Sequence, residues 1–269
     1  MDPTRDDNPL AGFKSGDPEQ PDRETVQREC AKHGAYAAER RKYGWRWMPW
    51  SGCEACAVEA EERERAQAAQ RAEREELQRR RELLSESGLL GTRFEVASFD
   101  TYQPATPRQR AALKAAQRYA AEVTPNSAGA LVLIGPPGVG KTHLAAAALL
   151  HVIGARGLSG CLVGARQYVR KVRETWGGNG SESDVLRDHA LPVLLVLDDL
   201  GTGAGTPNEQ ALLLDLVDAR YQRRRPVVLT SNLTRPELRA ALDERVWDRL
   251  QHDAVFVSVD GESHRRPAA

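Results

Sequence analysis

The sequence lacks long apolar stretches, carries no net charge and contains few cysteines, and these absences narrow the classes of protein to which it can belong. Its apolar runs are of strand or helix length, well short of a membrane span, and the acidic, proline-containing N-terminus has no signal-peptide profile. We therefore expect a cytoplasmic protein without a membrane partner. The formal net charge is +0 at pH 7, so any site for a polyanion has to be a local patch.

Composition divides the 269 residues into four expected segments. Residues 1–23 combine Asp, Pro, Gly and Asn with few large apolar groups, which predicts a disordered tail. Residues 24–58 hold three of the 4 cysteines and three of the 5 tryptophans and are a candidate metal module. Residues 59–88 are almost entirely Glu, Arg, Ala and Gln, which predicts a solvated linker helix; no sustained heptad seam supports a coiled coil. Residues 89–269 form the expected main domain.

The main domain alternates strand-like and helix-like segments. Strands are predicted at 130–134, 161–163, 191–197, 227–232 and 254–259, and helices at 107–122, 143–152, 166–176 and 208–224, with a flexible break at 177–183. This alternation predicts an α/β fold with a parallel sheet flanked by helices on both faces. A nucleotide is expected at the carboxyl ends of its strands.

One loop of this domain matches the phosphate-binding pattern. Its residues are Gly135, Pro136, Pro137, Gly138, Val139, Gly140, Lys141 and Thr142, and His143 opens the helical run that follows. Glycine suits such a loop because backbone N–H groups must approach phosphate oxygens where a Cβ would collide. We expect Lys141 to reach the β- and γ-phosphates of ATP, Thr142 to bind Mg²⁺, and His143 to complete the nucleotide-binding segment. A glycine-rich turn that matches by chance is the alternative.

Two further strands end in polar side chains. The aliphatic run at 191–197 stops at Asp198 and Asp199, which predicts a buried strand beside that of the phosphate loop. We assign Asp198 to Mg²⁺ and Asp199 to polarising the attacking water, against the alternative of two solvated acids opening a turn. The run at 227–231 ends at Asn232, which is placed to bond the water or the γ-phosphate, although an ordinary turn asparagine is the alternative.

Three cysteines and one histidine form two ligand pairs. Cys30 and His33, and then Cys53 and Cys56, each have two residues between them, a spacing that lets both side chains face one metal ion. A Cys₃His set suits tetrahedral Zn²⁺ with no open position, so we predict a structural zinc site. Disulfides or a chance spacing are the alternatives, but disulfides leave the histidine unexplained. The remaining Cys161 has apolar neighbours and is expected to be a buried thiol.

The candidate metal module is also rich in aromatic residues, and three interpretations of them stay open. Tyr43, Trp45, Trp47 and Trp50 lie among arginines and a lysine. They suit a stacking platform for single-stranded bases, a protein-binding face, or the small hydrophobic core that a mini-domain needs around its metal.

Taken together, these motifs make residues 89–269 resemble the DnaC/DnaI/IstB family of AAA+ ATPases, which includes helicase loaders and transposition helpers. The resemblance is carried by the phosphate loop and by the segments 93–94, 98–102, 195–201, 220–226, 230–233 and 244–250. It implies an AAA+ P-loop NTPase core with an abbreviated lid. The segments 30–34 and 50–56 are similar to the zinc-bearing front end of many phage-type loaders.

The resemblance also implies roles for individual residues. Asn232 matches sensor 1, and Arg249 matches the arginine finger that acts on the ATP of a neighbouring subunit. Arg265 is similar to the sensor 2 arginine, with Arg266 an equal contender. The basic helix expected at 166–176 occupies the region where this family contacts single-stranded DNA; a solvated helix face is the alternative.

The function that this resemblance implies is that of an ATP-dependent, DnaC-like helicase loader in DNA replication. Such a protein binds single-stranded DNA and a replicative helicase, assembles as a homo-oligomer on DNA, and hydrolyses ATP at subunit interfaces. One alternative is an IstB-like transposition helper ATPase, which the zinc front end disfavours because such helpers usually lack it. The other is a nucleotide-gated adaptor with little turnover.

Overall fold

The computed structural model describes residues 22–178, 180–201, 206–252 and 254–264. The contacts divide the chain into an amino-terminal unit, residues 1–73, and a carboxyl-terminal unit, residues 74–269. The tail expected at 1–23 falls outside the described residues except for its last two. Arg265 and Arg266, the two candidates for sensor 2, also lie outside them.

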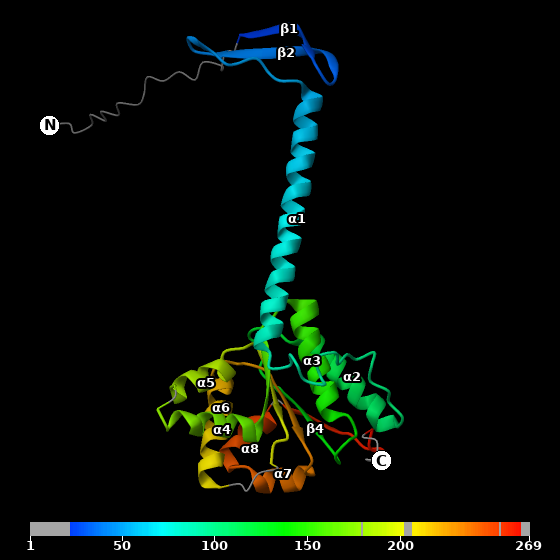
Figure 1. The fold of residues 1–269 in the computed structure, drawn as a ribbon, viewed down its shortest axis with the longest axis vertical. Coiled ribbons are helices and arrows are strands. Elements are labelled where there is room, and N and C mark those ends of the chain that lie inside the picture. Colours follow the sequence, from blue (N-terminus) through cyan, green and yellow to red (C-terminus); the bar gives the residue numbers. More distant parts are fainter. Residues whose placement is uncertain (1–21, 179, 202–205, 253, 265–269) are drawn as a thin grey trace, which may run out of the picture. The chain divides into compact units, whose positions relative to one another are not determined.

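The amino-terminal unit is a small antiparallel sheet followed by the start of a long helix (Figure 1). Its strands are β1 Arg23–Cys30, β2 Gly34–Tyr43 and β3 Arg46–Trp47, in the order β1-β2-β3. Gly34 and Gly44 take positive φ angles of 76° and 61° in the two hairpin turns, a conformation that glycine adopts without strain. Among the described residues of this unit only Ala38 and Cys53 are buried, so apolar packing by itself gives it little stability.

The expected charged helix is present as α1, Glu54–Glu86, which crosses the division between the two units. It buries none of its residues, and ion pairs such as Glu61–Arg65 and Glu76–Arg80 link successive turns, as expected of a solvated helix. It begins earlier than the sequence predicted, so Cys56 lies in its first turn and not in a preceding loop.

The carboxyl-terminal unit contains a parallel sheet of five strands, which confirms the predicted α/β class. The strands are β4 Ala130–Ile134, β5 Gly160–Gly164, β6 Leu194–Asp198, β7 Val227–Ser231 and β8 Ala254–Ser258. They lie in the order β5-β6-β7-β4-β8. We expected the acid-bearing β6 to be the direct neighbour of the phosphate-loop strand β4. That expectation is wrong, because β7 lies between them. Hydrophobic patterning identifies strands but does not reveal their lateral order.

Helices cover both faces of this sheet (Figure 1). They are α2 Pro107–Glu122, α3 Lys141–Arg156, α4 Ala165–Thr175, α5 Glu182–Ala190, α6 Pro207–Gln222, α7 Arg235–Ala241 and α8 Glu244–His252. Alternate residues of β4 enter opposite cores: Leu131 and Leu133 pack with α2 and α3, whereas Val132 packs with α4 to α8. Cys161 is buried, as predicted, and burial raises the pKa of its thiol to about 11.

Two elements differ from the sequence-based expectation. Helix α5 begins at Glu182, inside the stretch expected to be a flexible break. The strand expected from 191 begins only at Leu194, because Pro192 has no N–H to donate to a ladder and Val193 donates instead to the Ser159 hydroxyl, at 3.2 Å. The aliphatic run at 191–197 is therefore not a single strand, because its first three residues form the connection from α5 to β6.

Candidate nucleotide site and candidate metal centre

The phosphate loop lies between β4 and α3, at the carboxyl edge of the sheet. Gly135, Gly138 and Gly140 have φ angles of 151°, 87° and 93°. These positive φ angles favour glycine, and close packing also requires it at two of the positions. A Cβ on Gly135 would lie 1.9 Å from the Val259 carbonyl oxygen, and one on Gly140 would lie 2.5 Å from the Tyr102 ring. The loop is thus held in shape by the end of β8 and by the segment before α2.

Lys141 and Asn232, 91 residues apart in the chain, meet at this loop. The Lys141 ammonium donates to the carbonyl oxygens of Gly135 and Pro136 and to Oδ1 of Asn232, each at 2.8 Å. Its side chain is nearly buried, so its charge is screened little by water. The structure therefore puts one desolvated positive charge beside an amide, at the positive end of helix α3.

Asp198 is the last residue of β6, and Asp199 follows it directly. Oδ1 of Asp198 accepts hydrogen bonds from Thr142 Oγ1 at 3.0 Å and from Thr230 Oγ1 at 2.5 Å. Burial raises the pKa of Asp198, and the hydrogen bond from Thr230 opposes that shift. Asp199 takes a positive φ of 55°, and its Oδ1 accepts from Asn232 Nδ2 at 3.4 Å. A strained backbone at this position aims the second carboxylate toward the loop.

A pocket of about 240 Å³ opens where these groups converge. It is lined by Arg93, Phe94, Pro137, Gly138, Gly140, Lys141, Thr142, His143, Asp199, Asn232 and His264. Most of the sequence-predicted nucleotide-binding residues thus share one cavity, and Asp198 lies behind Thr142. Mg²⁺ fits this donor set, because a hydroxyl and two carboxylates are hard oxygen ligands.

Sequence reasoning missed three contributors to the site. The sequence assigns no individual role to Thr230, yet its hydroxyl donates a hydrogen bond to Asp198 and accepts one from the Asp199 N–H at 3.0 Å. Tyr102 covers Gly140 and donates to the Val139 carbonyl oxygen at 3.2 Å, and His264 donates its backbone N–H to Gly138. The one signal available for Thr230 was a threonine that follows the apolar residues Val227, Val228 and Leu229 in a predicted strand.

Arg249 lies away from this pocket. It projects from α8 and its Nε lies 2.5 Å from Oδ1 of Asp218 on α6, with the Tyr221 ring 5.9 Å away. About a quarter of each charged side chain is exposed. The guanidinium therefore sits at the surface of the unit and does not line the cavity formed by its own phosphate loop.

The basic helix α4 is amphipathic. Tyr168, Val169 and Val172 are buried, whereas Arg166, Arg170, Lys171 and Arg173 are exposed. Arg170 lies 3.8 Å from Glu174 and Arg173 lies 3.4 Å from Glu209, both at the surface, where such pairs contribute little energy and can exchange partners.

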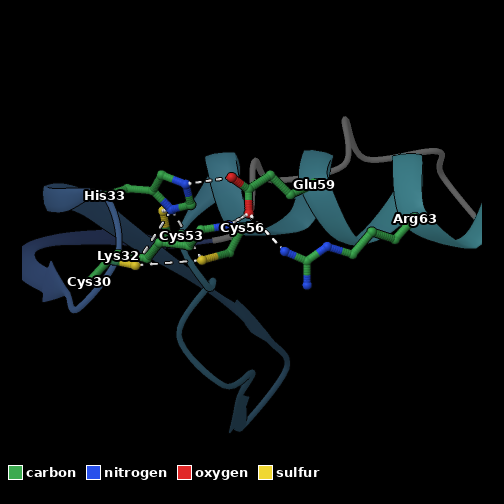
Figure 2. A network of polar contacts seen from close by, with 7 residues as sticks. All are labelled: Cys30, Lys32, His33, Cys53, Cys56, Glu59 and Arg63. Carbon is green, nitrogen blue, oxygen red and sulfur yellow. Dashed lines mark hydrogen bonds and ion pairs between the residues drawn. The ribbon is translucent and has the colours of Figure 1, made fainter.

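The predicted metal ligands of the amino-terminal unit meet in one cluster (Figure 2). The ligand atoms of Cys30, His33, Cys53 and Cys56 all lie within 4.8 Å of one another. Nδ1 of His33 is 3.7, 3.6 and 3.3 Å from the three Sγ atoms, and Sγ of Cys30 is 3.5 Å from that of Cys56. Zinc bonds of ordinary length give tetrahedral edges of roughly 3.5–3.8 Å, so this donor set fits Zn²⁺.

The local electrostatics of the cluster favour a thiolate. The backbone N–H groups of Lys32 and His33 lower the pKa of Cys30 to about 6. The Cys56 thiol donates a hydrogen bond to the Cys30 sulfur, which raises the pKa of Cys56 to about 11, as expected of neighbouring thiols that cannot all ionise without a cation. Cys53 precedes α1 and Cys56 lies in its first turn, so two ligands come from the helix start and two from the β1–β2 hairpin.

A phosphate loop at the end of a central parallel strand, with paired acids on β6 and an asparagine after β7, defines an ATPase of the AAA+ class. The family model described as "IstB-like ATP binding protein" matches residues 62–268, and the chain belongs to this family. The matched residues exclude the cysteine cluster. Within the part of the chain that the structure describes, no helix combines the length and apolar character needed to cross a bilayer.

Relatives and solved structures agree on this class. The chain is 32% identical over 172 residues to the replicative helicase loader DnaC of Buchnera aphidicola subsp. Acyrthosiphon pisum (strain APS), covering 63% of this chain and 69% of the relative. It is 31% identical over 140 residues to the insertion sequence IS5376 putative ATP-binding protein of Geobacillus stearothermophilus, covering 50% and 55%. A crystal structure of the DnaC helicase loader superposes with a TM-score of 0.58 at 26% identity, covering 62% of this chain and 99% of that one.

Proposed function

We propose that this ATPase loads a replicative helicase onto single-stranded DNA. The observation that carries the proposal is the similarity to DnaC loaders, at 32% identity over 172 residues, together with a nucleotide site built from the expected side chains. The cysteine-histidine module gives the chain a second, separate unit with which to hold a protein partner. In this proposal ATP binding drives assembly on DNA, and hydrolysis ends the association.

The residues of the pocket have distinct tasks in hydrolysis. Lys141 binds the β- and γ-phosphates, while Thr142 and Asp198 hold Mg²⁺, which neutralises charge that develops on the phosphates. Asp199 polarises the attacking water. Asn232, which bonds both Lys141 and Asp199, aligns that water with the γ-phosphate.

The arginine of α8 completes the site of a neighbouring subunit. Arg249 is at the surface and outside its own pocket, which suits a group supplied to another copy. Positive charge beside the γ-phosphate is worth roughly 10³ to 10⁵ in rate in related phosphoryl transfers, so hydrolysis depends on assembly. Arg265 is proposed as a further contact to the nucleotide, by its family position alone.

The basic face of α4 is the proposed contact to single-stranded DNA. Its four exposed cations suit phosphate oxygens, and affinity should therefore fall steeply as salt is added. Zn²⁺ at the cysteine-histidine cluster is proposed to hold the hairpin and the helix start in one shape for the helicase. The four side chains Cys30, His33, Cys53 and Cys56 would supply a closed set of structural ligands.

A loading assay tests the proposal directly. Full-length protein, ATP and a replicative hexameric helicase are mixed with circular single-stranded DNA, and helicase retained on the circle is measured after gel filtration. Retention that needs both ATP and this protein supports a loader. No retention, with ATP turnover intact, contradicts it.

A second candidate is an IstB-like transposition helper. It is favoured by the matching family description and by the relative from insertion sequence IS5376. Binding to double-stranded DNA with capture of a transposase, and no effect on helicase retention, supports this function instead. A nucleotide-gated adaptor is distinguished by the absence of steady-state hydrolysis with and without single-stranded DNA.

A further inference from the structure

Glu59 lies one helical turn beyond Cys56 and reaches back to the metal ligand His33 (Figure 2). Its Oε1 is 3.0 Å from Nε2 of His33, whereas the three sulfur atoms surround the other ring nitrogen, Nδ1. The two nitrogens of one imidazole thus face different partners, a carboxylate on one side and the thiol cluster on the other.

A neutral imidazole has one N–H and one lone pair, so the partner of one nitrogen decides what the other can do. A carboxylate beside Nε2 keeps the proton there, as a donor to Oε1. Nδ1 then carries the lone pair that a metal ion requires. We propose that Glu59 is a positioning residue that makes Nδ1 the ligand atom of His33; this rests on the zinc site of the proposed function.

Two cations hold the carboxylate in place. Oε2 of Glu59 is in direct contact with the Lys32 ammonium and lies 3.7 Å from the Arg63 guanidinium. Lys32 sits in the turn of the β1–β2 hairpin beside His33, so the same carboxylate touches the hairpin at two adjacent residues. The Glu59 side chain is 36% exposed and is fixed at both oxygens, whereas Glu62, three residues along α1, is classed as exposed.

The first measurement is zinc affinity of the full-length protein by competition with a chromogenic chelator. Glu59→Ala is expected to weaken zinc binding by about 10- to 100-fold, the usual effect of removing an outer partner of a ligating histidine. Glu59→Gln keeps an oxygen acceptor for Nε2–H and should recover part of the loss. Glu62→Ala, a matched loss of one acid from the same helix, should bind zinc as the wild type does.

A further variant separates the histidine contact from the ion pair. Lys32→Ala removes the ammonium but leaves the Glu59 bond to His33, and it should weaken zinc binding by less than about 3-fold, because an ion pair at the surface contributes little. An equal loss in Lys32→Ala and Glu59→Ala would mean that the ion pair, and not the orientation of His33, is what matters, which overturns the proposal.

The second measurement is the protonation pattern of His33 in ¹⁵N-histidine-labelled protein, read from long-range ¹H–¹⁵N spectra. The wild type should show metal-bound Nδ1 and protonated Nε2, and the pattern should vanish in His33→Cys. Zinc bound through Nε2, or unchanged affinity in Glu59→Ala, overturns the role of Glu59 alone. A wild type that binds no zinc overturns the metal site as well. If the zinc and histidine measurements come out as expected but helicase loading fails, the proposed function is wrong and the role of Glu59 is supported.

Discussion

The hydroxyl of Thr230 on β7 donates a 2.5 Å hydrogen bond to the carboxylate of Asp198 on β6. The same hydroxyl accepts from the Asp199 N–H at 3.0 Å. One side chain therefore fixes both members of the acid pair, from the strand that separates them from the phosphate loop. Since Asn232 directly follows β7, the same strand aligns the acids and positions the amide that contacts Lys141.

Replacing Thr230 with valine tests this alignment. The substitution keeps the shape of the buried side chain but removes the hydrogen bond that opposes the raised pKa of Asp198. We expect the Mg²⁺ concentration for half-maximal hydrolysis to rise about 10-fold or more, as for other outer partners of metal ligands. Titrations of Mg²⁺ in steady-state assays measure it. Thr230→Ser retains the hydroxyl and should stay near wild type; a valine variant that does the same would refute the alignment.

Lys141 and Asn232 should separate binding from turnover. Lys141→Ala removes the charge proposed to reach the phosphates and should abolish detectable ATP binding. Asn232→Ala should leave ATP affinity within a few-fold and lower kcat by about 10²-fold, because we propose that the amide acts mainly on the attacking water. Fluorescent-nucleotide titration and phosphate release give the two quantities. Retained affinity in Lys141→Ala would count against the site itself.

Arg249 should act on the ATP of another copy. Arg249→Ala is expected to keep nucleotide affinity and to lose hydrolysis by about 10³-fold. Mixing it with Lys141→Ala should restore turnover, since the first subunit holds ATP and the second supplies an intact arginine. Arg245→Ala, one turn earlier on α8 and not paired with Asp218, is the matched control. Two inactive variants that stay inactive on mixing would argue that the site is not shared.

How much the sequence revealed depends on whether a feature is local. The phosphate loop, the strand that ends at Asp198 and the cysteine spacing are patterns of neighbouring residues, and the structure brings each set together. The lateral order of strands is not local. Nothing in the run at 227–231 indicates that this strand, β7, lies between the loop strand β4 and the acid strand β6. The prediction that β6 is the direct neighbour of β4 was therefore wrong.

Partners from distant segments were beyond sequence reasoning for the same reason. Thr230 and Asp198 are 32 positions apart in the chain and His33 and Glu59 are 26 apart, and no periodic signal in the sequence links either pair. Glu59 is one of many acids in the expected linker helix, and the composition of that helix gives it no special role, although the structure shows its i,i+4 pair with Arg63 at 3.7 Å. Its contact with His33 depends on how the start of α1 meets the β1–β2 hairpin, which no pattern of neighbouring residues indicates.

Arg220 gives a prediction about stability. This fully buried guanidinium donates to five backbone carbonyls, those of His189, Ala190, Pro192, Val193 and Pro226. It thereby caps the end of α5 and joins the starts of β6 and β7. Arg220→Met should lower the free energy of unfolding by at least ~3 kcal/mol, because several buried carbonyls lose their donor. Denaturant melts measure the loss, and exposed Arg223→Met is the matched control. A small loss would mean that the carbonyls find other donors.

His189, whose carbonyl Arg220 holds, should make stability depend on pH. Burial lowers the pKa of its imidazole below 6.5, and its hydrogen bond to the Val185 carbonyl oxygen only partly opposes this. The unfolded chain therefore binds the proton more readily than the folded one, so the contribution of His189 is complete above pH 6.5 and is lost as pH falls toward the lowered value. The positive charges of Lys171 and Arg220 act in the same direction.

Replacing His189 with glutamine should remove this slope. We expect urea midpoints of the wild type to fall as the pH decreases below about 6.5, and those of His189→Gln to change less over the same interval. The glutamine loses the edge-on contact with the Tyr168 ring, 5.3 Å away, and so lowers stability at pH 7.5. The test compares how steeply the urea midpoints of the two proteins change with pH, not their absolute values. His151→Gln is the control. If the midpoints of the wild type, His189→Gln and His151→Gln all change with pH in parallel, groups other than His189 set the acid sensitivity of this domain.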